Sequence, residues 1–353
     1  MRIAVWNTAF LGDAVLTLPL IRSLRLRFPD AETDFYVRGG LEGLFRPHPD
    51  VGAVFGYAKG GRSPAGIVAQ ARRVAARRHD LWISAHGSFR SGVIAALSGA
   101  RERIGYARPA WNRIFYTRTA DRRFGELHEI ERLLELLRPL GEGPLADWPE
   151  IALGPESARK AEDFFAHIPG PVLGMHPGSV WATKRWPAEY YAEIGARALA
   201  HGASVLLFAG KGEEALSQAV RAMISGRRGG RGVDDAGRLH DFGGRLPLPD
   251  LAAFLGRLSC YLGNDSGPMH LAWAQRRPVT AVFGPTVEKF GFFPRGEAST
   301  VIQKDLPCRP CGLHGPSACP LKHHRCMRDI SPDEVWDDVR PKLLTRGKHD
   351  CLY

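Results

Sequence analysis

Short apolar runs alternate with amphipathic stretches along the first half of the chain. We predict strands at residues 2–6, 33–37, 53–55 and 81–83, and helices at residues 13–28, 65–78, 89–97 and 126–140. In the first predicted helix, Leu16, Leu20 and Leu24 recur at the spacing that puts them on one face. Strands that alternate with helices in this way indicate an α/β fold with a parallel sheet.

The same alternation restarts after residues 141–170, a Pro- and Gly-rich stretch with one short predicted helix at 156–167. The second half carries predicted strands at residues 172–175, 204–208, 260–262 and 278–283, and predicted helices at 187–200, 213–224, 248–258, 271–275 and from 331 onward. We therefore predict two α/β domains, residues 1–165 and 166–353. The last helix is a candidate to pack back on the first domain.

The most informative run is Gly-Asn-Asp-Ser-Gly-Pro-Met-His at residues 263–270, between an apolar strand and a helix. Asp265 or Ser266 is suited to cap that helix, and Pro268 suits its first turn. Gly267 lets a ligand come close to the backbone. A helix N-terminus binds anions through its free N–H groups and its dipole. The run predicts a site for the diphosphate of a nucleotide-sugar, and the alternative is an ordinary strand-to-helix turn.

Three other strand ends carry candidate chemistry. Asp13 follows the first strand, and it is either a first-turn helix acid or a general base. The turn at 176–179 and Lys184 follow a second strand and form a candidate phosphate site, while Glu213 follows a third and is suited to accept hydrogen bonds from a ribose. The carboxyl ends of parallel strands share one rim of a sheet, so we expect the second-half residues to converge on one pocket.

Several motifs then occur in a fixed order. They are Gly12-Asp13 with Leu16-Thr17-Leu18-Pro19, His176-Pro177-Gly178-Ser179 with Lys184-Arg185-Trp186-Pro187, the run at 263–270, and Phe283-Gly284-Pro285-Thr286. This set resembles the ADP-heptose:lipopolysaccharide heptosyltransferases of glycosyltransferase family 9, most closely the heptosyltransferase II type, over nearly the whole chain. The resemblance implies a GT-B fold, in which two Rossmann-like domains face each other across a cleft.

The resemblance also implies an inverting, metal-independent transfer of heptose from ADP-heptose to the inner core of lipopolysaccharide. By this likeness Asp13 is the general base for the acceptor hydroxyl, and Lys184 offsets the charge on the leaving ADP. Donor-binding roles fall to Gly12, Ser179, Glu213, Leu246, Asp265, Ser266, Gly267 and His270. Glu213 would bind the ribose and Leu246 would meet the adenine. The first domain would then bind the acceptor and the second the donor.

The first half is strongly basic, since residues 51–79 contain six Lys or Arg residues and no acid. We predict that Arg62 and Arg90 bind the acceptor, because lipid A with its inner core carries phosphates and Kdo carboxylates. The segment is also a candidate landing surface for anionic lipid. The alternative is a solvated helix face without a ligand.

The formal net charge is +11, which fits an acidic substrate, an anionic membrane surface or nucleic acid. Nucleic acid is not expected, because the basic residues lack interleaved aromatic residues for stacking. The chain has no apolar run of about 18 residues and no recognisable signal peptide. We therefore expect a cytoplasmic enzyme with peripheral contact to the inner membrane.

Four cysteines, Cys308, Cys311, Cys319 and Cys326, lie in one short segment. Such a cluster binds zinc or remains as reduced thiols, and we favour thiols because the spacings are looser than those of a zinc ribbon. No cofactor is therefore expected. Two other functions stay open: a family 9 enzyme that uses another nucleotide-sugar for O-antigen or outer core, and a nucleotide-binding module without turnover.

Overall fold

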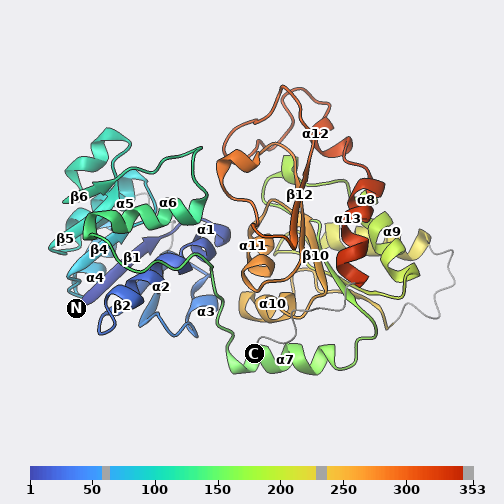
Figure 1. Ribbon diagram of the computed structural model, residues 1–353, viewed down its shortest axis with the longest axis horizontal. Helices are drawn as coiled ribbons and strands as arrows, with labels where there is room; N and C mark the ends of the chain where they lie inside the picture. The colour runs from blue at the N-terminus through green and yellow to red at the C-terminus, as the bar shows by residue number, and fades with distance from the viewer. Residues whose placement is uncertain (58–63, 228–236, 345–353) are drawn as a thin grey trace. The chain divides into compact units, whose positions relative to one another are not determined.

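The computed structural model describes residues 1–57, 64–227 and 237–344. The chain divides into two compact units, Met1–Leu153 and Gly154–Tyr353, each built around a sheet flanked by helices (Figure 1). The division lies ahead of the predicted boundary at residue 165, because α7 (Pro155–Phe165) packs on α10 (Leu248–Leu255). Ser157 Oγ of α7 donates to Asp250 Oδ1 of α10 at 2.5 Å.

In the described part of the first unit, six parallel strands lie in the order β3-β2-β1-β4-β5-β6. They are β1 (Arg2–Asn7), β2 (Glu32–Arg38), β3 (Ala53–Tyr57), β4 (Leu81–Ser84), β5 (Glu102–Tyr106) and β6 (Arg118–Ala120). The helices are α1 (Leu11–Leu16), α2 (Leu18–Arg27), α3 (Glu42–Phe45), α4 (Pro64–Ala75), α5 (Phe89–Leu97) and α6 (Glu129–Leu134), with 3₁₀ helices η1 (Ala110–Ile114) and η2 (Glu135–Leu140).

The described part of the second unit repeats this arrangement, with the strand order β12-β11-β10-β7-β8-β9. Its strands are β7 (Val172–His176), β8 (Ser204–Leu207), β9 (Leu239–Asp241), β10 (Cys260–Asn264), β11 (Val279–Phe283) and β12 (Ser299–Gln303). Besides α7 and α10, its helices are η3 (Ala182–Lys184), α8 (Ala188–Ala200), α9 (Glu214–Arg227), α11 (Gly267–Ala274), η4 (Glu288–Phe290), α12 (Arg325–Arg328) and α13 (Pro332–Leu344).

Both sheets therefore reverse their strand order at an equivalent point, between β1 and β4 in the first unit and between β7 and β10 in the second. Ligands of open α/β sheets bind in the crevice at the carboxyl ends of the strands at such a reversal. The motif loops that follow β1, β7 and β10 lie at these two points. The predicted α/β, Rossmann-like architecture is confirmed.

Two long helices of the sequence prediction are wrong. The stretch at 13–28 forms two helices that meet at Thr17, since Pro19 lacks an N–H and its ring disfavours a continuous helix. The stretch at 126–140 begins as α6 and continues as the 3₁₀ helix η2, which contains Pro139. The Pro residues were visible in the sequence, but the apolar periodicity continues across them.

The last helix, α13, packs on the sheet of its own unit. Val335, Val339 and Leu343 are buried in one core cluster with Trp186 and residues of β7 and β10. Lys342 Nζ donates to Thr280 Oγ1 and to the carbonyl of Val279, which ties the helix to β11. No helix in the described ranges is long and apolar enough to cross a membrane.

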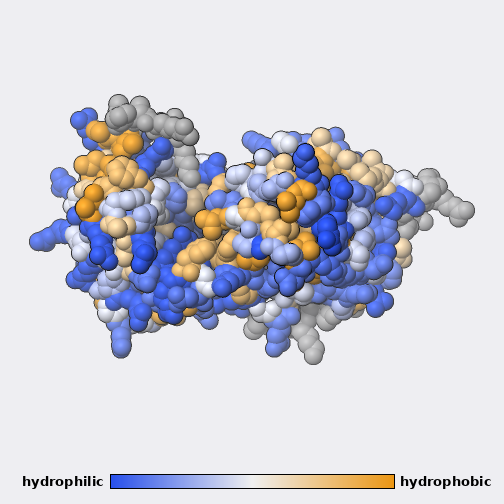
Figure 2. Space-filling view, turned by 90° about the horizontal axis from the view of Figure 1, so that it is seen from above, coloured by the Kyte–Doolittle hydropathy of each residue, from blue (hydrophilic) through white to orange (hydrophobic). Residues whose placement is uncertain are grey.

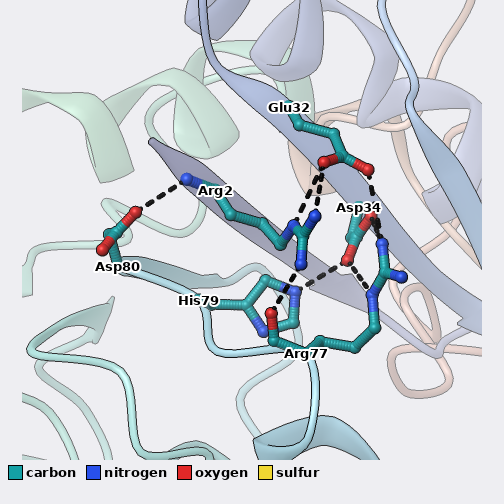
Figure 3. Close-up of polar contacts among 6 residues, drawn as sticks. All are labelled: Arg2, Glu32, Asp34, Arg77, His79 and Asp80. Carbon is teal, nitrogen blue, oxygen red and sulfur yellow. Dashed lines mark hydrogen bonds and ion pairs between the residues drawn. The ribbon is translucent and has the colours of Figure 1, made fainter.

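The amino ends of β1 and β2 are joined by a buried polar network (Figure 3). The carboxylate of Asp34 is fully buried and accepts hydrogen bonds from Arg77 Nε and His79 Nε2, both at 2.9 Å. Arg2 binds Glu32 on the neighbouring strand at 2.7 Å, and its backbone N–H donates to Asp80. The network fixes the strand register at the end of the sheet opposite the functional loops.

Candidate functional site

Asp13 lies in the first turn of α1, directly beyond the carboxyl end of β1. Its Oδ2 accepts the backbone N–H of Phe10 at 3.1 Å. Asn7, the last residue of β1, donates from Nδ2 to the carbonyl of Asp13 and to Thr17 Oγ1, and Thr17 donates to the same carbonyl. These bonds hold the backbone of Asp13 in one place, while one oxygen of its carboxylate accepts the Phe10 N–H. Gly12 beside it is buried in α1.

The environment of Asp13 raises its pKa to about 6. Burial is the largest cause, because it disfavours the charged form, and the negative charge of Glu129 adds to it. The Phe10 N–H and Arg122 oppose the shift. Glu129 is itself buried between Arg122 and Arg132, whose nitrogens lie 3.1 and 2.5 Å from its oxygens. A carboxyl group with a pKa near 6 is a base that holds and releases a proton near neutral pH.

A pocket of about 480 Å³ opens at the carboxyl ends of β1, β3 and β4 in the same unit. Its wall is partly aromatic and partly polar, with Trp6, Thr8, Tyr57, Ile67, His86, Ser88, Phe89, Arg90 and Ser91. Ser91 Oγ organises the polar side, since it lies 3.0 Å from Trp6 Nε1, 2.9 Å from His86 Nδ1 and 2.9 Å from Ser88 Oγ. The predicted acceptor residue Arg90 lines this pocket. Arg62, the other predicted acceptor residue, lies outside the described residues.

In the second unit, Lys184 and Asp265 meet as the sequence predicts. Lys184 Nζ lies 2.5 Å from Asp265 Oδ2, and both side chains are buried. Thr286 Oγ1 donates to the same carboxylate oxygen at 2.7 Å. The loops after β7, β10 and β11 therefore converge on one carboxylate, which holds the ammonium group of Lys184 at the strand-order reversal.

The start of α11 presents polar atoms without partners. Ser266 is the N-cap residue, but its side chain makes no capping hydrogen bond, so the predicted capping by Asp265 or Ser266 is wrong. Among the described residues, the buried Ser266 Oγ and His270 Nδ1 have no hydrogen-bond partner. Burial lowers the pKa of His270 to about 4, with Asp265 opposing and Lys184 adding to the shift, so the ring is neutral at pH 7. Buried unpaired groups at a helix N-terminus beside Lys184 are the features of an anion site.

Glu213 joins the loops after β7 and β8. Its Oε2 accepts the Gly210 N–H at 3.0 Å, and its other oxygen lies 3.5 Å from Arg185 Nη2. A Cβ on Gly178 would lie 2.2 Å from Glu213 Oε2, so a side chain at that position would displace the Glu213 carboxylate. Ser179 is buried in the same turn, and its carbonyl accepts Arg185 Nε at 2.8 Å. The predicted residues Ser179 and Glu213 therefore lie on one rim.

The segment around Leu246 follows β9 on the same rim. Gly244 donates its N–H to the carbonyl of Ala209 at 2.9 Å, which places the turn before Leu246 beside the loop after β8. Leu246 is half-buried. This position brings Leu246 to the side of Glu213 rather than of α11.

Comparison with known proteins adds the family. A sequence profile of glycosyltransferase family 9 (heptosyltransferase) matches residues 67–319. The chain belongs to glycosyltransferase family 9. It is 24% identical to lipooligosaccharide heptosyltransferase 2 of Campylobacter jejuni, with 99% of this chain and 100% of that protein aligned. The E. coli ADP-heptose LPS heptosyltransferase II structure matches with a TM-score of 0.79 at 22% identity, over 98% of this chain and 99% of that one. A family 9 glycosyltransferase of Veillonella parvula matches with a TM-score of 0.81 at 23% identity, over 97% of each chain.

As a family 9 glycosyltransferase, the chain has the GT-B architecture that the resemblance implied. The strand-order reversal of the first unit carries Asp13 and the pocket, and that of the second unit carries the Lys184 cluster.

Two residues that the sequence analysis did not assign to the site organise it. Asn7 fixes the Asp13 loop, as described above. Asn264, fully buried at the end of β10, donates from Nδ2 to the carbonyls of Pro177 and Gly178. Its Oδ1 accepts the Trp186 N–H at 3.0 Å, so one side chain holds both flanks of the β7 loop. Each Asn ends a strand beside a motif, and that position was the signal available in the sequence.

The cysteine segment lies next to the Lys184 cluster, although it is distant from Lys184 along the chain. Thr183 Oγ1 donates to the carbonyl of Pro316, and His324 Nε2 lies 2.8 Å from the carbonyl of Thr183. Cys311 donates its N–H to the carbonyl of Pro285. In the described ranges Cys308, Cys311, Cys319 and Cys326 are free, and no group of three or more His, Cys, Asp or Glu residues there is arranged to hold a metal ion.

Proposed function

We propose that the protein transfers a heptose from ADP-heptose to the inner core of lipopolysaccharide with inversion at the anomeric carbon. The observation that carries the proposal is the anion site at the start of α11, where unpaired Ser266 and His270 atoms lie in the field of Lys184. A nucleoside diphosphate is the anion that such a site on a Rossmann-like sheet binds. The E. coli relative named above is an ADP-heptose LPS heptosyltransferase, which supports this donor.

Each donor group then has a partner. The N–H groups from Gly267 onward, Ser179 and Lys184 bind the diphosphate, and Ser266 and His270 complete its polar contacts at the sugar end. Asp265 holds Lys184 in position. When the donor binds, the ammonium group of Lys184 exchanges the Asp265 oxygen for an oxygen of the diphosphate. Two further assignments follow the rim: Glu213 accepts the ribose hydroxyls, and Leu246 contacts the adenine. Gly12, in the first unit, contributes close backbone approach to the donor.

The reaction uses the two units together. A hydroxyl oxygen of the acceptor attacks the anomeric carbon while its proton passes to the carboxylate of Asp13. The bond from that carbon to the ADP oxygen breaks on the opposite face, and its electron pair leaves with ADP. Lys184 and the α11 N–H groups stabilise the negative charge that develops there. The configuration inverts because attack and departure take place on opposite faces.

The acceptor belongs to the first unit. The pocket beside β4 combines aromatic surface, which stacks on sugar rings, with hydroxyls and Arg90, which bind a carboxylate or phosphate. Arg62 is proposed as a second contact. Lipid-linked inner core is such an acceptor, and the relative from Campylobacter jejuni is a lipooligosaccharide heptosyltransferase. This acceptor places the enzyme at the cytoplasmic face of the inner membrane. No nucleic acid and no catalytic metal are part of the proposal.

The decisive experiment incubates the purified protein with ADP-heptose, or with other nucleotide-sugars, and a heptose-deficient lipopolysaccharide acceptor. We expect transfer from ADP-heptose only. Asp13→Ala should bind ADP with unchanged affinity and lose transfer by about 10³-fold or more. Asp30→Ala, an exposed acid near β2, is the matched control. Transfer from another nucleotide-sugar would favour the O-antigen or outer-core alternative, and ADP binding without any transfer would favour the non-catalytic module.

A further inference from the structure

An apolar patch on the first unit is built from rings that pack on one another yet face the solvent. We define the η1 patch as Phe89, Trp111, Ile114 and Phe115. The ring centroids of Phe89 lie 5.4 Å from Trp111 and 5.3 Å from Phe115. Phe89 is 59% exposed and Ile114 is 74% exposed. Clustered exposed apolar residues mark interaction surfaces.

The η1 patch is held in place by buried contacts. Asn112, in the middle of η1, is fully buried, and its Nδ2 donates to the carbonyls of Tyr106 and Arg108, both at 3.0 Å. Phe115 packs on α5, where a Cβ on Gly92 would lie 2.3 Å from its ring. The fold thus fixes the backbone from beneath and directs Ile114 outward, so the patch is a preformed surface.

The charge around the η1 patch is almost entirely positive. Residues 84–120 contain six arginines and one acid, Glu102. That acid is paired with Arg118 at 3.0 Å. Arg101, Arg108 and Arg113 are exposed. Figure 2 shows apolar residues gathered on the unit that contains the patch, with strongly hydrophilic residues around them. Exposed Phe and Ile side chains beside a half-buried Trp, among arginines, are the composition of a surface that inserts shallowly into an anionic bilayer.

We propose that the η1 patch docks the first unit on an anionic phospholipid bilayer. Ile114 and the aromatic rings enter the interfacial layer, and Arg108 and Arg113 contact lipid phosphates. Phe89 belongs both to the patch and to the wall of the acceptor pocket. Docking through this surface therefore brings the pocket to the level of the lipid headgroups. This inference adds a membrane-docking surface to the proposed function. It rests on the proposed function only for the reason why the protein docks.

The test is co-sedimentation of the purified protein with vesicles of phosphatidylcholine, alone or with about one third phosphatidylglycerol. We expect binding to the anionic vesicles that weakens between about 0.05 and 0.5 M salt, because added salt screens the arginines. Ile114→Glu and Arg113→Glu should each reduce this binding about tenfold. Leu145→Glu changes an exposed apolar residue elsewhere on the same unit and should have no effect. Equal thermal stability of the variants establishes that they fold.

Transfer is measured in parallel with a delipidated, water-soluble acceptor and with acceptor embedded in anionic vesicles. Ile114→Glu should slow only the second reaction. Absence of wild-type binding to anionic vesicles, or wild-type binding by Ile114→Glu, would overturn the inference, and a protein partner would then be the occupant to seek. If vesicle binding behaves as expected while no acceptor is glycosylated, the docking surface stands and the proposed function fails.

Discussion

Replacing Asp13 by Asn should stabilise the protein while it abolishes transfer. The carboxyl group of Asp13 has a pKa of about 6 instead of its ordinary 3.8, chiefly because burial disfavours its charge. A difference of about two pKa units corresponds to about 3 kcal/mol, by which ionised Asp13 destabilises the folded state at pH 8. Asn has the same shape, keeps an oxygen for the Phe10 N–H and carries no charge. In the proposed mechanism, the substitution also removes the proton acceptor for the reaction.

Because the pKa of Asp13 is raised rather than lowered, the stability difference between Asp13→Asn and the wild type should grow as the pH rises. The folded-state pKa of Asp13 lies above its unfolded value, so its stabilising contribution is complete below about pH 4 and is lost as the pH rises through about 6. The excess stability of Asp13→Asn should therefore be about 3 kcal/mol above pH 7 and less than about 1 kcal/mol at pH 4. For a unit of this size, the larger value raises the unfolding temperature by about 5–10 °C.

Thermal unfolding of both proteins from pH 4 to pH 8 measures this difference. Asp34→Asn is a control with the opposite sign. Burial acts to raise the pKa of Asp34, but the hydrogen bonds from His79 and Arg77 outweigh it and hold that pKa below its ordinary value. Asp34→Asn should therefore lose stability at pH 7, and this loss should persist down to about pH 4, because the folded-state pKa of Asp34 lies below its ordinary value. An Asp13→Asn protein that is less stable at pH 8, or whose difference from wild type does not change with pH, would refute the reasoning.

Three further outcomes are expected. In the wild type, kcat/KM for transfer should fall about tenfold per pH unit below about pH 6, and Glu129→Gln should move this limb to lower pH, because the charge of Glu129 raises the pKa of Asp13. Lys184→Met should lower kcat by about 10²–10³-fold in a steady-state assay, whereas the exposed Lys211→Met should not. Removing divalent metals with EDTA should leave the rate unchanged, since Lys184 and α11 supply the positive charge at the leaving group; a lost rate that Mg²⁺ restores would contradict this.

The sequence predicted an element correctly where the pattern of apolar residues and the residues that end the element agree. Central strands such as β1, β7 and β10 are continuous apolar runs that end in Gly or polar residues, so both their type and their carboxyl ends were predictable. The convergence of the motif loops on one edge of each sheet followed from the parallel direction of the strands alone. The strands β5, β6, β9 and β12 were missed, because polar residues interrupt their short apolar runs, which therefore look like loops.

Other features depended on tertiary contacts that no local pattern reports. Ser266 has the side chain and position of an N-cap, yet its hydroxyl remains unpaired at the start of α11. The cysteine segment is distant along the chain from the other motifs, yet Thr183 and Pro285 bind it next to Lys184. The pKa of Asp13 depends on Glu129, more than a hundred residues away, which no reading of the Asp13 loop alone would include.

Both units hold their motif loops in the same way, although the loops carry different charged groups. Each site loop leaves a strand at the reversal of strand order, where the chain must stop pairing and its polar backbone still needs partners. A buried asparagine supplies them in both units, Asn7 at the end of β1 and Asn264 at the end of β10. An amide both donates and accepts hydrogen bonds, so it fixes the loop without adding a net charge. The charged groups are then free for function: a carboxylate whose pKa is raised by burial in the first unit, and an ammonium group balanced by Asp265 in the second.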